Sequence, residues 1–198
     1  SPGPSGDTNM NKRSRVVILR NPAKPAAEAT MAALAECVSR QANVVGTGVI
    51  ATGTTVEMDA FRDNPPDRVI VLGGDGSILA AARAMGNQQV PIVGVNFGKL
   101  GYLAEFSTEA LEKNLYDVLN NPSIISHRMM IEVVVTRNGA KTHQSQAVND
   151  CVVHAGPPYR MIQLSISVDQ MHLTNATCDG LVVSTPSGST AHNLSIGG

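Results

Sequence analysis

The residues best placed to do chemistry in this sequence form one glycine-rich run, Gly73, Gly74, Asp75 and Gly76. Residues 69–72 before it are wholly apolar and predict a strand buried on both faces. Ser77 after it is a favourable N-cap for a helix whose apolar face would hold Ile78, Leu79, Ala82 and Met85. A strand, a glycine turn and a helix in this order bring backbone N–H groups and the positive end of a helix dipole together. The run therefore predicts a phosphate-binding turn.

Asp75 is the unusual member of this run, because a carboxylate repels the phosphate that the turn would attract. It can hold a Mg²⁺ ion that offsets the phosphate charge, or accept the proton of a hydroxyl that attacks phosphorus. The plainer alternative is a turn aspartate that bonds its own backbone. The turn is not a P-loop, since the lysine motif is missing. It is also not a complete dinucleotide fingerprint, since Leu79 stands where the third glycine belongs.

Three further groups of polar residues lie beside apolar runs. Asn149 and Asp150 place an amide next to a carboxylate, which suits the two hydroxyls of a ribose, although a plain Asx turn explains the pair equally well. Asp179 precedes the apolar residues 181–183. Residues 184–192 then gather small and hydroxyl side chains before a predicted helix. The strand that leads into this last group favours an ordered turn against a ligand over a flexible loop.

Composition limits the classes of function. The chain has 198 residues and a net charge of −1, from 15 basic and 16 acidic residues, with no block of either sign. This balance argues against nucleic acid or an anionic membrane as the main partner. The 3 cysteines form no paired motif, so a disulfide framework and a zinc site are not expected and a reducing cytosol is the default. No apolar run approaches the roughly 18 residues that span a bilayer.

The order of the predicted elements divides the chain. Residues 1–14 are expected to be a disordered tail. Residues 15–125 alternate strands (16–19, one weak strand after 43, 69–72, 90–95) with helices (26–40, from 77, and from the Ser107-Thr108 cap). Such alternation predicts a parallel sheet with helices on its faces. Residues 126–198 instead predict antiparallel strands at 129–136, 144–153, 161–168 and 171–175, with Asn138-Gly139 as a hairpin turn. We thus expect a Rossmann-like α/β domain followed by a mainly antiparallel β domain.

Together these motifs resemble the NAD kinase family. Residues 72–77 with Ala81-Ala82-Arg83 are similar to the GGDG motif and its helix, and Asn96 to Leu103 is similar to an Asn-x-Gly-x-Leu-Gly-aromatic loop. Asn149-Asp150 resembles the Asn-Glu/Asp pair of the family. Residues 179–191 resemble its Asp-Gly segment followed by a Ser/Thr/Gly-rich run. Four motifs in the family's order are far more specific than GGDG alone.

The resemblance implies a kinase that phosphorylates the 2′-hydroxyl of the adenosine ribose of NAD, with ATP and Mg²⁺, to give NADP. Asp75 would be the catalytic residue, Gly73, Gly74 and Gly76 would lie against the ATP phosphates, and Ser77 would be a further cofactor-binding residue of the turn. The dinucleotide would be bound by Asn96, Tyr102, Asn149, Asp150, Asp179, Ser187, Thr190, Ala191, His192 and Ser195. No metal ligand is assigned within the chain. Members of the family are cytosolic homodimers or homotetramers.

Two departures from the family pattern affect fine substrate contacts. His192 stands where the family commonly has tyrosine, and Cys178 stands where it commonly has glycine. Because the family continues through more β structure, we expect the β domain to be truncated at Gly198. The alternatives are another GGDG-type kinase acting on a lipid or sugar, and a non-catalytic nucleotide-binding regulator. The donor, ATP or polyphosphate, stays open.

Overall fold

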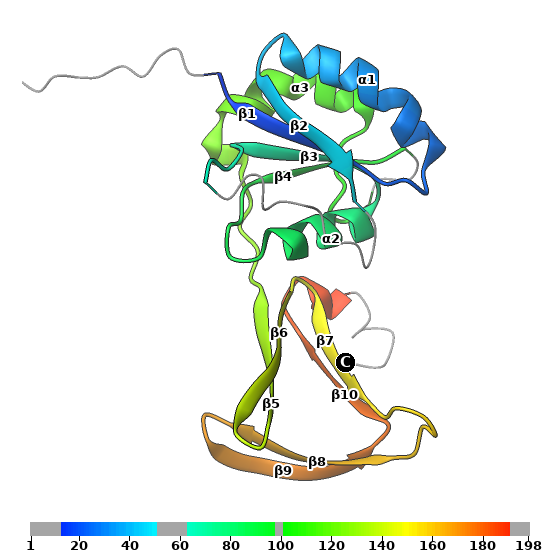
Figure 1. Cartoon of the computed structure of the whole chain (residues 1–198), viewed down its shortest axis with the longest axis vertical. Coiled ribbons are helices and arrows are strands. Elements are labelled where there is room, and N and C mark those ends of the chain that lie inside the picture. The colour runs from blue at the N-terminus through cyan, green and yellow to red at the C-terminus, as the bar shows by residue number, and fades with distance from the viewer. Residues whose placement is uncertain (1–12, 51–62, 98–100, 191–198) are drawn as a thin grey trace, which may run out of the picture. The chain divides into compact units, whose positions relative to one another are not determined.

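A computed structural model describes residues 13–50, 63–97 and 101–190 of the chain (Figure 1). The chain divides into two units, Ser1–Ser126 and His127–Gly198, called here the N-terminal and C-terminal units. The described elements of the N-terminal unit are β1 (Arg15–Arg20), α1 (Pro25–Ser39), β2 (Asn43–Val49), β3 (Arg68–Leu72), α2 (Asp75–Met85), β4 (Ile92–Val95), α3 (Thr108–Asn120) and the 3₁₀ helix η2 (Pro122–Ile124).

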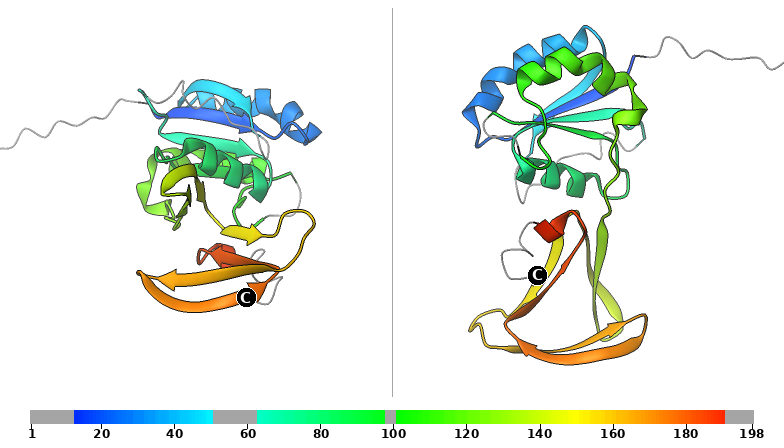
Figure 2. Two further views of the ribbon diagram at one scale, coloured as in Figure 1. Left: turned by 60° about the horizontal axis from the view of Figure 1, so that its bottom comes forward. Right: turned by 180° about the vertical axis from the view of Figure 1, so that it is seen from behind.

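The strands of the N-terminal unit form one parallel sheet in the order β2-β1-β3-β4. Helices α1 and α3 cover one face of this sheet and α2 covers the other, as the view from behind shows (Figure 2). The predicted Rossmann-like arrangement of a parallel sheet between helices is therefore confirmed. Of the weak strand expected after residue 43, the structure contains β2, and residues 51–62 lie outside the described part.

The central strands β1 and β3 are apolar at every position except the arginines at their ends, because both of their faces are buried. In β1, Val16 and Ile18 pack with α1 and α3, whereas Val17 and Leu19 pack with α2. Burying each such side chain is worth about 1.5–3 kcal/mol, so the two layers of side chains hold helices on both faces of the sheet. A strand exposed on one face would have alternated with polar residues instead.

The helix ends follow local chemistry. Pro25 occupies the first turn of α1, where its missing N–H removes no helical hydrogen bond. The hydroxyl of Ser107 accepts a hydrogen bond from the N–H of Ala110 at 3.2 Å, so this serine is the N-cap of α3, as predicted. The apolar face of α3 is buried through Leu111, Leu115, Val118 and Leu119, which also confirms the periodicity.

The start of α2 corrects one prediction. The helix begins at Asp75 with Gly74 as its N-cap, so Gly76 lies inside the first turn and Ser77 is not the N-cap. The hydroxyl of Ser77 is buried and accepts a hydrogen bond from the Asn21 side-chain amide at 2.9 Å. This partner lies 56 residues away in the sequence, so the local pattern could not reveal it.

The C-terminal unit contains β5 (Ile131–Arg137), β6 (Ala140–Ala147), β7 (Asp150–His154), β8 (Ile162–Val168), β9 (Met171–Cys178), β10 (Gly180–Ser184) and the 3₁₀ helix η3 (Gly188–Thr190). Its strands pair antiparallel as β5-β6, β8-β9 and β7-β10. Asn138 and Gly139 turn the first hairpin with φ of 52° and 76°. Positive φ at both positions matches the twist of a two-residue hairpin, so the antiparallel character and the Asn-Gly turn are confirmed.

The strand predicted at 144–153 is wrong, because the structure divides it into β6 and β7. The break falls at Val148 and Asn149, whose carbonyl groups accept hydrogen bonds from Thr185. Those carbonyls serve a tertiary contact instead of a strand ladder. The helix predicted after the small-residue run falls on residues 191–198, which lie outside the described residues. The described part of the chain ends with η3.

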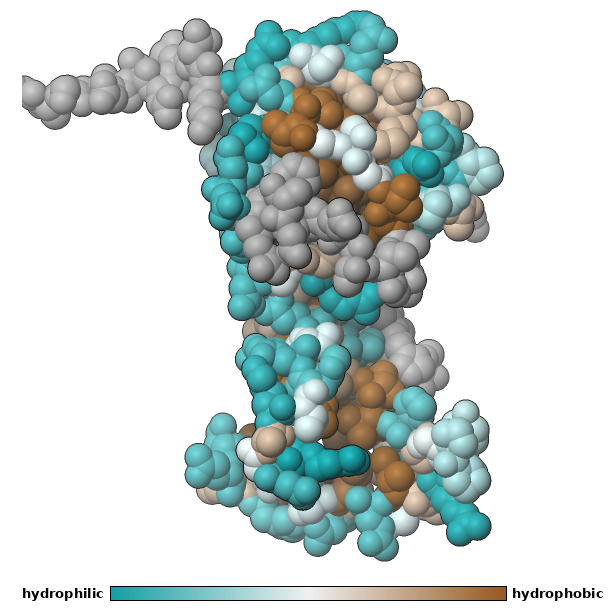
Figure 3. Space-filling model, viewed as in Figure 1, coloured by the Kyte–Doolittle hydropathy of each residue, from teal (hydrophilic) through white to brown (hydrophobic). Residues whose placement is uncertain are grey.

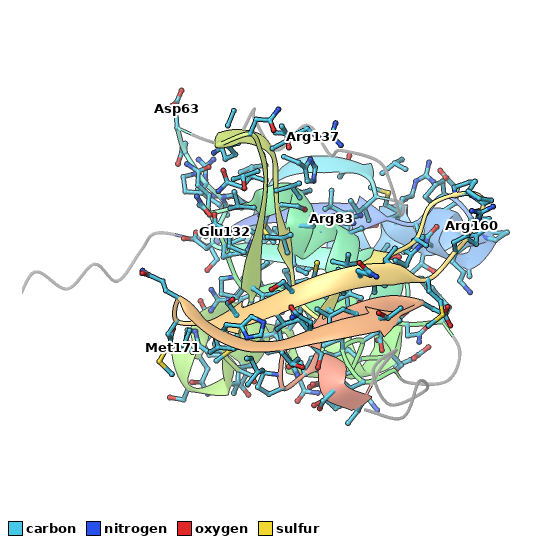
Figure 4. All side chains as sticks on the ribbon, turned by 90° about the horizontal axis from the view of Figure 1, so that it is seen from below. Asp63, Arg83, Glu132, Arg137, Arg160 and Met171 are labelled. Atoms are coloured by element: carbon cyan, nitrogen blue, oxygen red, sulfur yellow. The ribbon has the colours of Figure 1, made fainter. Side chains whose placement is uncertain are left out.

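Apolar side chains of the C-terminal unit are widely exposed. Among the described residues, every buried hydrophobic side chain belongs to the N-terminal unit. In the C-terminal unit, apolar residues gather over β7 and β10, where Val152, Val153 and Val183 are exposed (Figure 3). Met171 extends from the β8–β9 turn, 75% exposed (Figure 4). Strand pairing rather than a packed core thus holds the described part of this unit. None of the described helices has the length and apolar character needed to cross a membrane.

Candidate active site

The glycine turn lies at the point where the sheet changes direction. From β1 the chain adds β2 on one side, and β3 and β4 on the other, so the carboxyl ends of β1 and β3 mark the topological switch point. Ligands of open α/β sheets bind outside the strand ends at this point. Gly73 follows β3 and Asn21 follows β1, and the N–H of Asn21 donates to the carbonyl of Leu72 at 2.9 Å. The structure therefore brings these two loops together.

Gly73 has to be glycine because of this close approach. A Cβ atom at this position would lie 2.5 Å from the Ser77 hydroxyl oxygen and 3.3 Å from the Cβ of Asn21. The Asn21–Ser77 hydrogen bond occupies the space that a side chain would need. The side chains of Asn21 and Ser77 therefore pack against Gly73 and restrict the backbone of the turn.

Asp75, at the first position of α2, is bound by a second loop. Its Oδ1 accepts hydrogen bonds from the N–H groups of Leu103 and Ala104, and its Oδ2 accepts one from Tyr102, each at 3.0 Å. The alternative of a turn aspartate bonding its own backbone is thus wrong in detail, because the partners lie 27 to 29 residues away. The carboxylate is also placed favourably at the positive end of α2.

Two glycines allow the second loop to approach Asp75 this closely. A Cβ on Gly101 would lie 2.2 Å from Oδ1 of Asp75. A Cβ on Gly94, in β4, would lie 2.8 Å from the Cα of Ala104 and 2.2 Å from a methyl group of Ile78. The loop therefore packs directly against both the strand and the first turn of α2.

Two predicted dinucleotide-binding residues belong to the same region. Tyr102 carries one of the three amides on Asp75 and leaves 59% of its surface exposed. Asn96 follows β4, where its N–H donates to Phe106 and its side-chain oxygen accepts from the N–H of Phe97. Residues 98–100 between them lie outside the described part of the chain. The side chain of Asp75 in the first turn of α2 and the backbone of the exposed Tyr102 are accordingly brought together.

The C-terminal unit joins its own polar groups. Asp150 pairs with Ser184 in the β7–β10 ladder, so Asn149 stands next to the small-residue run. The N–H of Thr185 donates to the Asn149 carbonyl at 2.8 Å. The Ser187 hydroxyl accepts a hydrogen bond from the Arg128 guanidinium at 3.3 Å. The amide–carboxylate pair and the hydroxyl-rich turn, separate in sequence, thus form one group.

Asp179 is not part of that group. It precedes β10 at the end where Gly180 pairs with His154, whereas Asn149 adjoins the opposite end of the same ladder. Its carbonyl accepts a hydrogen bond from the N–H of Ala155 at 3.3 Å. Cys178 ends β9 opposite Ile162. The length of the β7–β10 ribbon therefore separates Asp179 from Asn149.

Three predicted site residues, Ala191, His192 and Ser195, lie outside the described residues. Thr190 ends η3, and its hydroxyl donates to the carbonyl of Ser187 at 3.4 Å. Among the described residues, no cluster of three or more His, Cys, Asp or Glu side chains forms a metal-binding group.

Sequence reasoning missed Asn21, Thr185 and Arg128. Asn21 could have been found, because it directly follows a predicted strand of the parallel sheet, and polar residues at such strand ends commonly lie near ligands. Thr185 belongs to the predicted run 184–192, but its neighbours in the sequence do not indicate that its own side chain is buried, with 1% of its surface exposed. The Arg128 contact depends on a partner 59 residues away.

The fold and these polar groups define a doubly wound α/β unit with a glycine turn, joined to an antiparallel β unit. Residues 10–124 match the ATP-NAD kinase N-terminal domain and residues 148–198 match the ATP-NAD kinase C-terminal domain. The chain belongs to the NAD kinase family.

Curated relatives named NAD kinase include those of Syntrophotalea carbinolica, 45% identical over 132 residues, and Rhodopirellula baltica, 44% identical over 138 residues. These matches cover 67% and 70% of this chain but only 46% and 44% of the relatives. The matched region thus amounts to about half the length of the relatives.

Two solved structures share the fold. The yeast NADH kinase complexed with NADH superposes with a TM-score of 0.80 and 26% identity, covering 96% of this chain and 62% of that protein. An NAD kinase from Archaeoglobus fulgidus in complex with ATP has a TM-score of 0.68 and 23% identity, covering 93% of this chain and 66% of that protein. The latter likeness concerns the fold alone.

Proposed function

We propose that this chain carries out the reaction of its family, transfer of the γ-phosphoryl group of ATP to the 2′-hydroxyl of the adenosine ribose of NAD, which gives NADP. The observation that most supports this proposal is that both family domains match the chain in order. The first match contains the Asp75 turn and the second contains the Asn149 group. The relative solved with NADH, 26% identical to this chain, supports a dinucleotide as the acceptor.

In this proposal Asp75 acts on the attacking hydroxyl through Oδ2. Each carboxylate oxygen can accept about two hydrogen bonds. Toward the described residues, Oδ1 accepts two amides and Oδ2 accepts one, so Oδ2 has the greater remaining capacity. A carboxylate held by three amides keeps a fixed direction, which suits orientation of the 2′-hydroxyl and uptake of its proton as phosphorus is attacked.

The phosphate groups of ATP are assigned to the backbone of Gly73 and Gly74 and to the first turn of α2 with Gly76. A Cβ on Gly74 would meet no atom within 4 Å, so the outer side of the turn has room for a ligand among the described residues. Ser77 has a different part, because its hydroxyl is turned into the protein toward Asn21. It packs against Gly73 on the protein side of the turn, and its side chain is not assigned to the phosphates.

The dinucleotide is assigned to the remaining residues. Asn149 and Asp150 suit the ribose hydroxyls, since their backbone is fixed against the small-residue turn. Tyr102 supplies an exposed ring for a base. The separation of Asp179 from Asn149 along the β7–β10 ribbon agrees with contacts to two different ends of an extended ligand. Asn96, Ser187, Thr190, Ala191, His192 and Ser195 complete the proposed set.

Mg²⁺ fits this site as a companion of the substrate. The described residues offer no cluster of metal ligands. Mg²⁺ is usually held by substrate phosphates and water with only one or two carboxylates, so it does not require a dedicated cluster of protein ligands. When bound, the ion would offset the charge of the triphosphate. We further propose a cytoplasmic homodimer or homotetramer that acts on nucleotides and has no nucleic acid or membrane partner.

The proposal is tested by incubating the purified chain with Mg-ATP and NAD and measuring NADP with an NADP-specific dehydrogenase. NADP should accumulate in proportion to protein. Asp75→Asn should lower the rate by about 10²–10⁴, the usual contribution of general acid–base catalysis. Asp117→Asn, on the exposed side of α3, is the matched control and should leave the rate unchanged.

Two results would contradict the proposal. One is the absence of NADP together with phosphorylation of a lipid or sugar acceptor, which would favour the other GGDG-type kinases. The other is Asp75→Asn retaining more than about half of the rate, which is far above the loss expected for a residue in acid–base catalysis. Replacing ATP with polyphosphate in the same assay identifies the donor.

A further inference from the structure

Thr185 is the most completely buried polar side chain of the C-terminal unit among the described residues, with 1% of its surface exposed. Its hydroxyl donates to the carbonyl of Val148 at 2.6 Å and lies 3.2 Å from that of Asn149. The same oxygen accepts the N–H of Gly188 at 3.0 Å. One hydroxyl group therefore joins the segment before β7 to the turn after β10.

The backbone of Thr185 strengthens this junction. Its N–H donates to the Asn149 carbonyl at 2.8 Å, and its own carbonyl accepts from the N–H of Ser189 at 3.0 Å. Gly188 packs so closely that a Cβ there would lie 1.9 Å from the carbonyl oxygen of Asn149. The position of Asn149 relative to the Ser187–Gly188 turn is thus set by Thr185 and by the absence of a side chain at Gly188.

We propose that Thr185 is a positioning residue for the dinucleotide, fixing the spacing between the Asn149-Asp150 pair and the Ser187–Gly188 turn. This inference rests on the proposed function, which assigns both groups to NAD. Two polar groups on separate segments bind one extended ligand well only when their separation is fixed in advance. Thr185 itself contacts no ligand in this proposal, and its hydroxyl is used entirely within the protein.

The test compares two substitutions. Thr185→Val keeps the shape of the side chain and removes the hydroxyl, and Thr185→Ser keeps the hydroxyl. Equilibrium binding of NAD and of Mg-ATP is measured separately for each. Thr185→Val should weaken NAD binding about tenfold, as expected when one hydrogen-bonded junction is lost, and should leave Mg-ATP binding within about twofold. Thr185→Ser should bind NAD within about threefold of the parent chain, because it retains the same donor and acceptor.

Thr142→Val is the matched control. It removes a threonine hydroxyl that donates to a backbone carbonyl, that of Val135 at 3.1 Å, within the exposed β5–β6 hairpin. Its binding of both nucleotides should equal that of the parent chain. Hydrogen exchange at the Gly188 amide gives a second readout, since the exchange should be faster in Thr185→Val only.

A measurement on the parent chain covers the case in which Thr185→Val does not fold. Saturation with NAD should slow hydrogen exchange at the amides of Thr185 and Gly188, because a ligand held by both segments stabilises their junction. Unchanged exchange at these amides would overturn the inference. So would normal NAD binding by Thr185→Val, or an equal loss of NAD and Mg-ATP binding. A parent chain that binds no NAD would overturn the proposed function itself, together with this inference.

Discussion

Asp75→Asn should destabilise the N-terminal unit as well as impair phosphoryl transfer. The carboxylate accepts three backbone N–H groups from the loop at Tyr102, Leu103 and Ala104. Asparagine retains one oxygen, which can keep the pair of bonds that Oδ1 now accepts. Its amino group then faces the N–H of Tyr102, donor against donor. At least one hydrogen bond to a charged group is lost.

The magnitude follows from that count. Hydrogen bonds to charged groups contribute about 1.5–3 kcal/mol each. Losing one such bond lowers the free energy of unfolding by about 1.5–3 kcal/mol, which should lower Tm by about 5–10 °C for a unit of this size. The substitution keeps the size of the side chain, so no cavity adds to the loss.

Thermal unfolding followed by circular dichroism measures the effect, with Asp117→Asn as the control for removing one negative charge. Hydrogen exchange at the amides of Tyr102, Leu103 and Ala104 shows whether the loop is the region that loosens. If Asp75→Asn unfolds within about 1 °C of the parent chain, the three bonds contribute nothing measurable, and the structural part of this reasoning is refuted.

Two further predictions concern other contacts. Gly188→Ala should destabilise the chain by about 1–3 kcal/mol or more, because its Cβ would lie 1.9 Å from the carbonyl oxygen of Asn149. Gly156→Ala, where a Cβ meets nothing within 4 Å, is the control, and equal unfolding temperatures would contradict the packing argument. The pKa of Glu109 is lowered by its own backbone N–H and by the N-cap serine. Glu109→Gln should therefore lower Tm near neutral pH, and the difference should vanish as pH falls through that lowered pKa. Identical pH profiles of Tm for the parent chain and Glu109→Gln would contradict this prediction.

The sequence predicted the elements whose causes are local. Runs of apolar residues gave the buried strands, Ser107 gave the start of α3, and Asn138-Gly139 gave a hairpin. These signals work because a cap, a turn or a two-sided burial is decided within a few residues.

The failures share one physical cause, hydrogen bonds between segments far apart in the chain. Ser77 lost its predicted capping role because its hydroxyl bonds Asn21. The strand at 144–153 was interrupted because Thr185 takes the carbonyls of Val148 and Asn149. Such contacts leave no periodic pattern in the sequence. Residue types therefore predicted which polar residues belong to the candidate site, but not their hydrogen-bond partners.

The three hydrogen bonds on Asp75 also connect two events thermodynamically. A ligand that binds the Asp75 carboxylate changes the stability of the loop that carries Tyr102, because that loop donates the three bonds. A ligand that binds Tyr102 and orders the loop must change the affinity of the carboxylate for its own ligand by the same free energy. Under the proposed function, binding at the phosphate turn and binding at Tyr102 therefore change each other's affinity by the same factor. Under the proposed function, the sign of this coupling depends on whether the three amides keep their acceptor on Asp75 when the nucleotide is bound.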